Sequence, residues 1–203
     1  MRDVTDITVL LDRSGSMKPL CGETITAVNA FIAEQQAVPG EATFTLIQFD
    51  NVDPQEVVQR AVPLRDARPL TAETYVPRGW TPLLDALGRC LTDTAKRLAG
   101  EAVDAEQPER LIRLEDADAP GKVVFVVMTD GLENASRTWT RERVFKLIEA
   151  RRTQDEWQVV FLGANQDAIQ EGTKLGVGAA FAMTYAADAA GVRDAYVSAG
   201  AAL

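Results

Sequence analysis

The sequence predicts an α/β fold, a doubly wound Rossmann-like and mostly parallel central sheet with an antiparallel edge strand and helices on both faces. Two observations predict it. Runs that are almost wholly apolar, such as Ile7–Leu11 and Val123–Met128, are typical of strands buried on both faces. These runs alternate with longer stretches of helical periodicity, as in βαβ units with right-handed crossovers.

The first part of the chain predicts one strand, one helix and a hairpin. Ile7–Leu11 stops at a Gly/Ser turn and is the first strand. Thr24–Ala37 carries apolar residues at helical spacing and ends at Pro39-Gly40, so it is a helix. Thr43–Phe49 and Glu56–Val62 predict two strands that pair through a turn and form the edge of the sheet.

The middle of the chain predicts a loop, a helix and an insertion. Residues 63–80 are rich in proline and have no sustained period. Thr81 then suits an N-cap and Pro82 the first helical position of a helix whose leucines form one stripe. Residues 101–118 hold seven acidic residues and two arginines, and we expect a solvated, mobile insertion at about residues 100–121.

The last part predicts the centre of the sheet. Lys122–Thr129 is the strongest strand and ends at Asp130-Gly131, and Cys90 and Met128 are expected in the core. The remaining expected elements are helix 140–153, strand 158–162, helix 166–175, strand 180–185 and helix 192–203. We expect one domain over residues 1–203.

Composition excludes several kinds of enzyme. The chain has no histidine, which rules out Ser-His-Asp and Cys-His catalysis and every His-bearing zinc site. Its two cysteines, Cys21 and Cys90, are too few for a Cys-only zinc site and fit a reducing compartment.

Charge and hydropathy limit the partners. The net charge of −9 disfavours nucleic acid, which is itself polyanionic. The longest apolar run is too short to span a bilayer, and the first residues are charged. We therefore expect a cytoplasmic protein with no membrane segment.

Five oxygen-bearing side chains are predicted to converge at one edge of the sheet. Asp12, Ser14 and Ser16 follow the first strand, and Asp130 follows the central one. Ligand sites form beyond the carboxyl ends of such strands, where the winding direction reverses. Thr81 opens the long helix within reach of this point. Two carboxylates and three hydroxyls suit a hard cation, Mg²⁺, Mn²⁺ or Ca²⁺.

The spacing has a physical reason. In Asp12-x-Ser14-x-Ser16, alternate residues of an extended turn point the same way. Hydroxyl ligands carry no charge, so a cation held largely by them stays electrophilic and attracts an external anionic oxygen. The pattern therefore favours a docking site over a storage site.

These three segments resemble the metal-ion-dependent adhesion site of von Willebrand factor A domains. The motifs are Asp12-x-Ser14-x-Ser16, Thr81-Pro82-Leu83 and Thr129-Asp130-Gly131, and the resemblance covers essentially the whole chain. It implies that Ser14, Ser16 and Thr81 coordinate the metal directly and that Asp12 and Asp130 act largely through water. A partner's carboxylate would complete the octahedron. Residues 130–136 and 161–167 look like bacterial and phage-type intracellular members.

Two functional hypotheses follow. The first is a binding module whose cation engages an Asp or Glu of a protein partner, with helix movement as a candidate switch of affinity. The second is a Mg²⁺-dependent phosphotransferase or phosphatase with Asp12 as nucleophile, although only Lys18 is close to that turn. Thr81 has a purely structural alternative as an N-cap, and Trp80 is either an exposed contact residue or a packing residue. The partner and the oligomeric state stay open.

Overall fold

The computed structural model describes residues 2–99, 120–164, 168–186 and 188–201. Its strands are β1 (Arg2–Asp12), β2 (Glu41–Phe49), β3 (Glu56–Pro63), β4 (Pro120–Thr129), β5 (Gln158–Ala164) and β6 (Ala182–Tyr185). Its helices are α1 (Cys21–Ala37), α2 (Leu83–Ala99), α3 (Arg141–Gln154), α4 (Ala168–Lys174) and α5 (Ala189–Ala201). Short 3₁₀ turns occupy Gly15–Leu20, Leu64–Asp66 and Ala179–Phe181.

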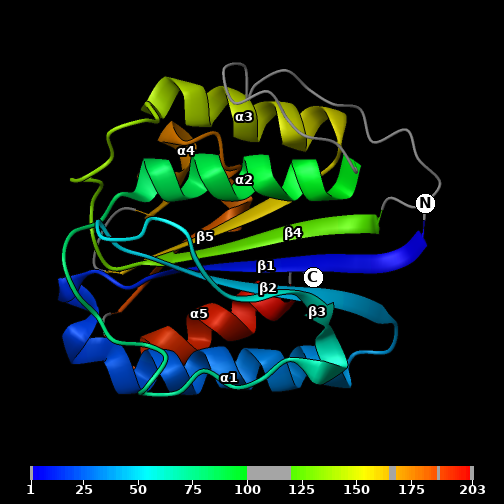
Figure 1. Ribbon diagram of the computed structural model, residues 1–203, viewed down its shortest axis with the longest axis horizontal. Coiled ribbons are helices and arrows are strands. Elements are labelled where there is room, and N and C mark those ends of the chain that lie inside the picture. Colours follow the sequence, from blue (N-terminus) through cyan, green and yellow to red (C-terminus); the bar gives the residue numbers. More distant parts are fainter. Residues whose placement is uncertain (1, 100–119, 165–167, 187, 202–203) are drawn as a thin grey trace.

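The six strands form one sheet in the order β3-β2-β1-β4-β5-β6. Every neighbouring pair is parallel except the β2–β3 hairpin at the edge. Figure 1 shows α1 and α5 on one face of the sheet and α2, α3 and α4 on the other. The predicted fold class is confirmed, including the antiparallel edge strand and the central position of β4.

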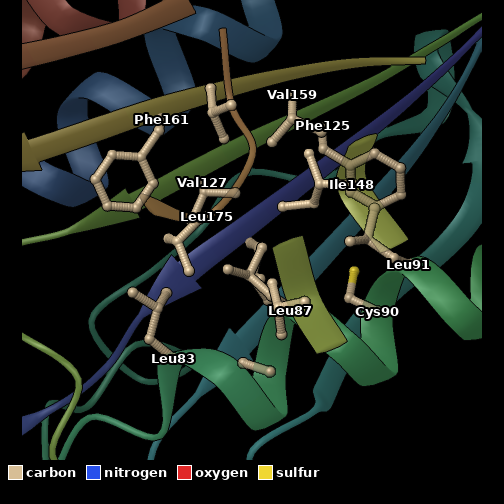
Figure 2. Packing of buried hydrophobic residues seen from close by; sticks show 14 of the residues in the cluster. Leu83, Leu87, Cys90, Leu91, Phe125, Val127, Ile148, Val159, Phe161 and Leu175 are labelled. Atoms are coloured by element: carbon tan, nitrogen blue, oxygen red, sulfur yellow. The ribbon is translucent and has the colours of Figure 1, made fainter. Parts of the chain in front are cut away.

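Buried apolar side chains cover both faces of the sheet. Along β1, Val9 and Leu11 face the cluster that contains α1 and α5, whereas Leu10 faces the cluster under α2 and α3. This two-sided burial explains why the central strands are apolar at nearly every position. Figure 2 shows the second cluster, where residues of α2 lie against those of β4, β5 and α3. Cys90 is buried in this second cluster and Met128 in the first, so both lie in the core as predicted.

Helix α2 is fixed laterally and at its far end. Gly88 lets α2 approach the segment that leads into α3, because a Cβ at this position would overlap the ring of Trp139. In the last turn, Arg97 donates two hydrogen bonds, of 2.8 and 2.9 Å, to the buried carboxylate of Asp6. Thr43 donates a third, of 2.6 Å, to the same carboxylate. The orientation of α2 is therefore determined by contacts with the sheet and with the segment before α3.

Most predicted boundaries differ from the structure by a few residues. Helix α1 begins at Cys21 rather than Thr24, because the 3₁₀ turn before it leads directly into the helix. Helix α5 begins at Ala189 rather than Val192. Residues 100–119, most of the predicted insertion, lie outside the described residues. Among the helices that the structure describes, none is both long and apolar enough to cross a membrane.

Candidate metal centre

The sheet topology brings the two predicted acidic ligands to the same edge. Strands β1 and β4 are parallel neighbours, with Leu11 opposite Met128. Asp12 is the last residue of β1, and Asp130 comes directly after the end of β4. The expected adjacency of these strands is confirmed, and the site lies where the strand order reverses.

Hydrogen bonds join four of the five predicted site residues. The main-chain N–H of Ser14 donates to Oδ1 of Asp12 at 2.7 Å. The hydroxyl oxygens of Ser14 and Ser16 lie 3.0 Å apart, and Ser16 Oγ donates to Oδ1 of Asp130 at 2.6 Å. Ser16 is exposed, so this chain of oxygens runs from a buried carboxylate to the surface.

Thr81 lies beside the same group. A Cβ added to Gly131 would lie 3.1 Å from Oγ1 of Thr81 and 3.7 Å from Oγ of Ser16. The hydroxyls of Thr81 and Ser16 therefore flank a position where glycine leaves space. The structure brings all five predicted residues together, with Thr81 almost completely buried.

The start of α2 differs from the prediction. The first hydrogen bond of the helix runs from the N–H of Ala86 to the carbonyl of Pro82, so the helix begins one residue later than Thr81-Pro82 suggested. Its first amides are capped from the segment after β4. Oε2 of Glu133 accepts from the N–H of Leu84 at 2.8 Å, and Oγ of Ser136 accepts from that of Asp85 at 3.0 Å.

This capping has a consequence for Thr81. Because Glu133 and Ser136 satisfy the first-turn amides, the helix does not need the Thr81 hydroxyl as a cap. Asn134 forms two hydrogen bonds with the main chain of Thr81. Its Oδ1 accepts from the Thr81 N–H at 2.9 Å, and its own N–H donates to the Thr81 carbonyl at 3.1 Å. The segment that carries Asp130 thus also positions Thr81.

Burial shifts the titration of both carboxyl groups. Burial raises the pKa of Asp12 to about 6, although hydrogen bonds from Thr129 and Ser14 oppose the shift. Burial also raises the pKa of Asp130, against a hydrogen bond from Ser16. Both shifts arise because a low-dielectric environment disfavours the charged form. A cation placed between the two groups would favour their carboxylate forms.

An arginine between the predicted ligands is engaged elsewhere. The buried guanidinium of Arg13 donates to Oδ2 of Asp50 at 2.9 Å, to Oε2 of Glu56 at 2.6 Å and to Oε1 of Gln48 at 3.2 Å. Arg78 donates to the same Asp50 oxygen at 2.8 Å. Both guanidinium groups are thus engaged by acids other than Asp12 and Asp130.

Two residues to which the sequence analysis assigned no role fix Asp12. The Thr129 hydroxyl donates to Oδ2 of Asp12 at 2.6 Å, and the buried Tyr75 hydroxyl donates to the Asp12 carbonyl at 2.7 Å. Thr129 belongs to the motif Thr129-Asp130-Gly131, and its role could have been inferred from its place at the end of the central strand. Tyr75 lies in the proline-rich loop, where no periodic pattern indicates which side chains are buried.

The residues present fit a small hard cation. Adjacent ligands of an octahedral Mg²⁺ at about 2.1 Å lie about 3.0 Å apart, and the two serine oxygens are separated by 3.0 Å. Within the described ranges, no group of three or more His, Cys, Asp or Glu residues could hold a metal. The donors here are instead hydroxyls with two carboxylates, a set that suits Mg²⁺, Mn²⁺ or Ca²⁺.

The fold resembles several solved structures, although no sequence-family model and no curated protein matches the chain. Proximal thread matrix protein 1 from the mussel byssus superimposes with a TM-score of 0.60 at 16% identity, over 95% of this chain and 46% of that one. One structure of that protein has a zinc-occupied MIDAS motif, as the adhesion site is abbreviated. A von Willebrand factor type A protein from Catenulispora acidiphila gives a TM-score of 0.58 at 14% identity, over 98% and 42%.

A third match is the pilus adhesin SpaC from Lactobacillus rhamnosus GG, with a TM-score of 0.65 at 12% identity, over 99% of this chain and 30% of the adhesin. The chain thus spans less than half the length of each of these proteins. At such identities the likeness concerns the fold. The chain has the fold of von Willebrand factor type A domains.

Proposed function

We propose that the chain is a metal-dependent protein-binding module that engages an Asp or Glu carboxylate of a partner. The observation that carries this proposal is the convergence of three hydroxyls and two carboxylates at one edge of the sheet. In this proposal Ser14, Ser16 and Thr81 hold the cation directly, and Asp12 and Asp130 act largely through water. Mg²⁺ is the expected cation, with Mn²⁺ or Ca²⁺ as substitutes.

The charge distribution supports binding of an anionic group. Neutral hydroxyls leave most of the charge of a divalent cation uncompensated, and Arg13 and Arg78 are already paired with acids. The attraction for a partner's carboxylate would therefore come from the metal. The net charge of −9 also favours a protein partner over nucleic acid.

The geometry favours binding over phosphoryl transfer. A nucleophilic Asp needs an oxygen free to attack, whereas Asp12 is buried with both carboxylate oxygens accepting hydrogen bonds. Lys18, the nearest lysine in the sequence, is exposed. Mg²⁺-dependent hydrolysis of p-nitrophenyl phosphate that disappears in Asp12→Asn would overturn the binding proposal in favour of the enzyme.

The metal step is tested by titration with Mn²⁺, followed by electron paramagnetic resonance of the free ion. Wild type is expected to bind one Mn²⁺, and the double variant Ser14→Ala, Ser16→Ala to bind it much more weakly. Ser198→Ala, at an exposed position of α5, is the matched control and should bind like wild type. Equal affinity of the double variant and wild type would contradict the assigned ligands.

The partner step needs a separate test. Proteins retained by immobilised wild type should be lost with EDTA and with Asp12→Ala. Once a partner is identified, changing its key Asp or Glu to the amide should abolish binding, because an amide brings no charge to the cation. Thr81→Ala should weaken partner binding more than Mn²⁺ binding. Retention that is unaffected by EDTA would contradict a metal-dependent module.

We also propose a single domain over residues 1–203 and a cytoplasmic location. Support for the location comes from Cys21 and Cys90, which are both free thiols, as suits a reducing compartment. Cell fractionation tests it, and recovery of the protein outside the cytoplasmic fraction would contradict it.

A further inference from the structure

Exposed apolar side chains gather around the candidate metal centre. Seven large hydrophobic residues are exposed among those described. Four of them lie in the loops that surround the site, and we call them the apolar rim: Val52 (69% exposed), Val76 (55%), Trp80 (64%) and Leu132 (59%). Such side chains are normal on a surface when scattered singly, but a group around a functional site marks an interaction surface.

Hydrogen bonds connect the rim loops with one another and with the site. In the loop of Val76, the Tyr75 hydroxyl and the Arg78 N–H donate to the carbonyls of Asp12 and Arg13. The Trp80 N–H donates to Oδ1 of Asn51 at 2.7 Å, which places the Val52 turn beside Trp80. Gly79 has a φ of 67°, and a Cβ there would collide with the Asn51 side chain. Glycine therefore permits this close contact.

The same loops reach the predicted ligands. The Gly15 N–H donates to the carbonyl of Gly79 at 3.0 Å, which joins the Trp80 loop to the serine turn. The segment of Leu132 is also brought to the site. Asn134, two residues after Leu132, forms hydrogen bonds with both the N–H and the carbonyl of Thr81. Trp80 itself is the residue before Thr81.

We infer that the apolar rim is the second half of the docking surface and that it receives a bulky apolar side chain located next to the partner's acidic residue. This inference rests on the proposed function, because the acid is the group that the cation would hold. The metal and the rim would bind two different groups of the same ligand. The cation requires one negative charge, whereas the rim gains from the removal of apolar surface from water.

The spacing of the two groups in the partner can be bounded. Trp80 and Thr81 are consecutive, and an extended partner chain advances about 3.3–3.6 Å per residue. A side chain that packs on Trp80 therefore belongs within about three residues of the acid. Tryptophan is also one of the residue types enriched among those that dominate the energy of an interface. The occupant we commit to is an exposed protein segment with an Asp or Glu and a Leu, Phe or Trp within this distance.

A set of immobilised peptides tests the inference. Each peptide carries one Asp in a Gly/Ser background, and a single Leu or Trp is placed in turn at every position within the stated reach. With Mn²⁺ present, at least one placement should bind wild type about tenfold more tightly than the Gly/Ser parent, a gain typical of one buried apolar side chain. EDTA, or Asn in place of Asp, should abolish binding.

Variants of the protein test whether the rim residues cause this gain in peptide affinity. Trp80→Ser and Val52→Ser should reduce the tenfold gain and leave both the Mn²⁺ affinity and the binding of the Gly/Ser parent unchanged. The matched control is Val38→Ser, which is 58% exposed and caps the C-terminal end of α1, whereas the serine turn leads into the other end of this helix. It should retain the full gain.

Each other result has a defined meaning. Equal binding of all Asp peptides, or an equal effect of Val38→Ser and Trp80→Ser, would overturn the apolar rim and leave the metal-dependent module intact. Binding of no Asp peptide, with Mn²⁺ still bound, would overturn the carboxylate proposal and the rim together. Sedimentation that shows Mn²⁺-dependent self-association, lost in Trp80→Ser, would assign the rim to a second copy of this chain and overturn the peptide-like partner.

Discussion

Asp12 connects the sheet with the candidate metal centre. It ends a central strand, is fully buried, and accepts hydrogen bonds only 2.6 and 2.7 Å long from Thr129 and Ser14. These donors are neutral, so they orient the carboxylate without removing its charge. Arg13, the next residue, turns away to Asp50 and Glu56. The site thus keeps a fixed and uncompensated acid, which is what the binding of a cation requires.

The affinity for a cation is expected to depend on pH. Burial raises the pKa of Asp12 to about 6, and a cation has to displace the proton below this pH. Mn²⁺ affinity should therefore fall by about tenfold per pH unit below about pH 6 and level off above about pH 7. Titrations across this range measure the effect. An affinity that stays constant down to about pH 5 would contradict it.

Metal affinity should rise with pH, but the same pKa shift should make the metal-free protein less stable as the pH rises. The folded form binds the proton more tightly than the unfolded chain, whose Asp has a pKa near 3.8. The stability contribution of Asp12 is therefore fully present below that value, and it is lost as the pH rises through about 6. Urea unfolding of metal-free wild type and Asp12→Asn should diverge in this window.

At the scale of elements, helix α2 depends on the segment after β4. Glu133 accepts from the N–H groups of Leu84, Ala135 and Ser136, so Glu133→Ala leaves several amides without an acceptor. We expect a loss of about 1–3 kcal/mol in the free energy of unfolding, measured with urea. Glu149→Ala, on the exposed side of α3, is the matched control and should change it little. Equal stabilities of the two variants would show that the cap is unimportant.

The packing of α2 against Trp139, two residues before α3, gives a second prediction. Gly88→Ala improves helix propensity but places a methyl group into the Trp139 ring. We expect a net loss of about 1–3 kcal/mol from overpacking. Gly22→Ala in α1, where nothing lies within 4 Å of the added Cβ, should instead be neutral or stabilising. Thermal unfolding compares the two, and a stabilised Gly88→Ala would show that Trp139 moves freely.

These elements also show what a sequence can predict. The apolar runs around Leu10 and Val126 predicted the central strands, and their ends predicted where Asp12 and Asp130 would meet. The predicted cap at Thr81 was wrong, because the acceptor that satisfies the helix comes from Glu133, 49 positions away from Leu84. The pairing of Arg13 with Asp50 was missed for the same reason. The local pattern of apolar residues indicates which face of a strand or helix is buried. Contacts such as Glu133 with Leu84 instead depend on how the fold brings distant loops together.

For the whole molecule, the sheet makes the site a property of the native state. The ligand turns come from β1, the start of α2 and the end of β4, so the five residues converge only when the domain is folded. A cation that binds this arrangement and not the unfolded chain stabilises the fold by mass action. Metal binding can therefore be measured through stability.

Millimolar Mg²⁺ or Mn²⁺ is expected to raise the temperature of unfolding. At about a hundredfold excess over the dissociation constant the gain is about 2.7 kcal/mol, which corresponds to about 5–10 °C for a chain of this size. EDTA should reverse the shift, and the double variant Ser14→Ala, Ser16→Ala should fold normally and show none. No shift with either ion in wild type would exclude the site.

The position of the metal turn at the end of β1 has a mechanical consequence. The strand begins at Arg2 and ends at Asp12, and it is paired along most of this length with β2 on one side and β4 on the other. Tension between a partner held at the cation and the N-terminal end of the domain would act along β1 and load both ladders in shear. Because the hydrogen bonds of both ladders would then share the force instead of opening one after another, we expect the domain to resist pulling in this direction.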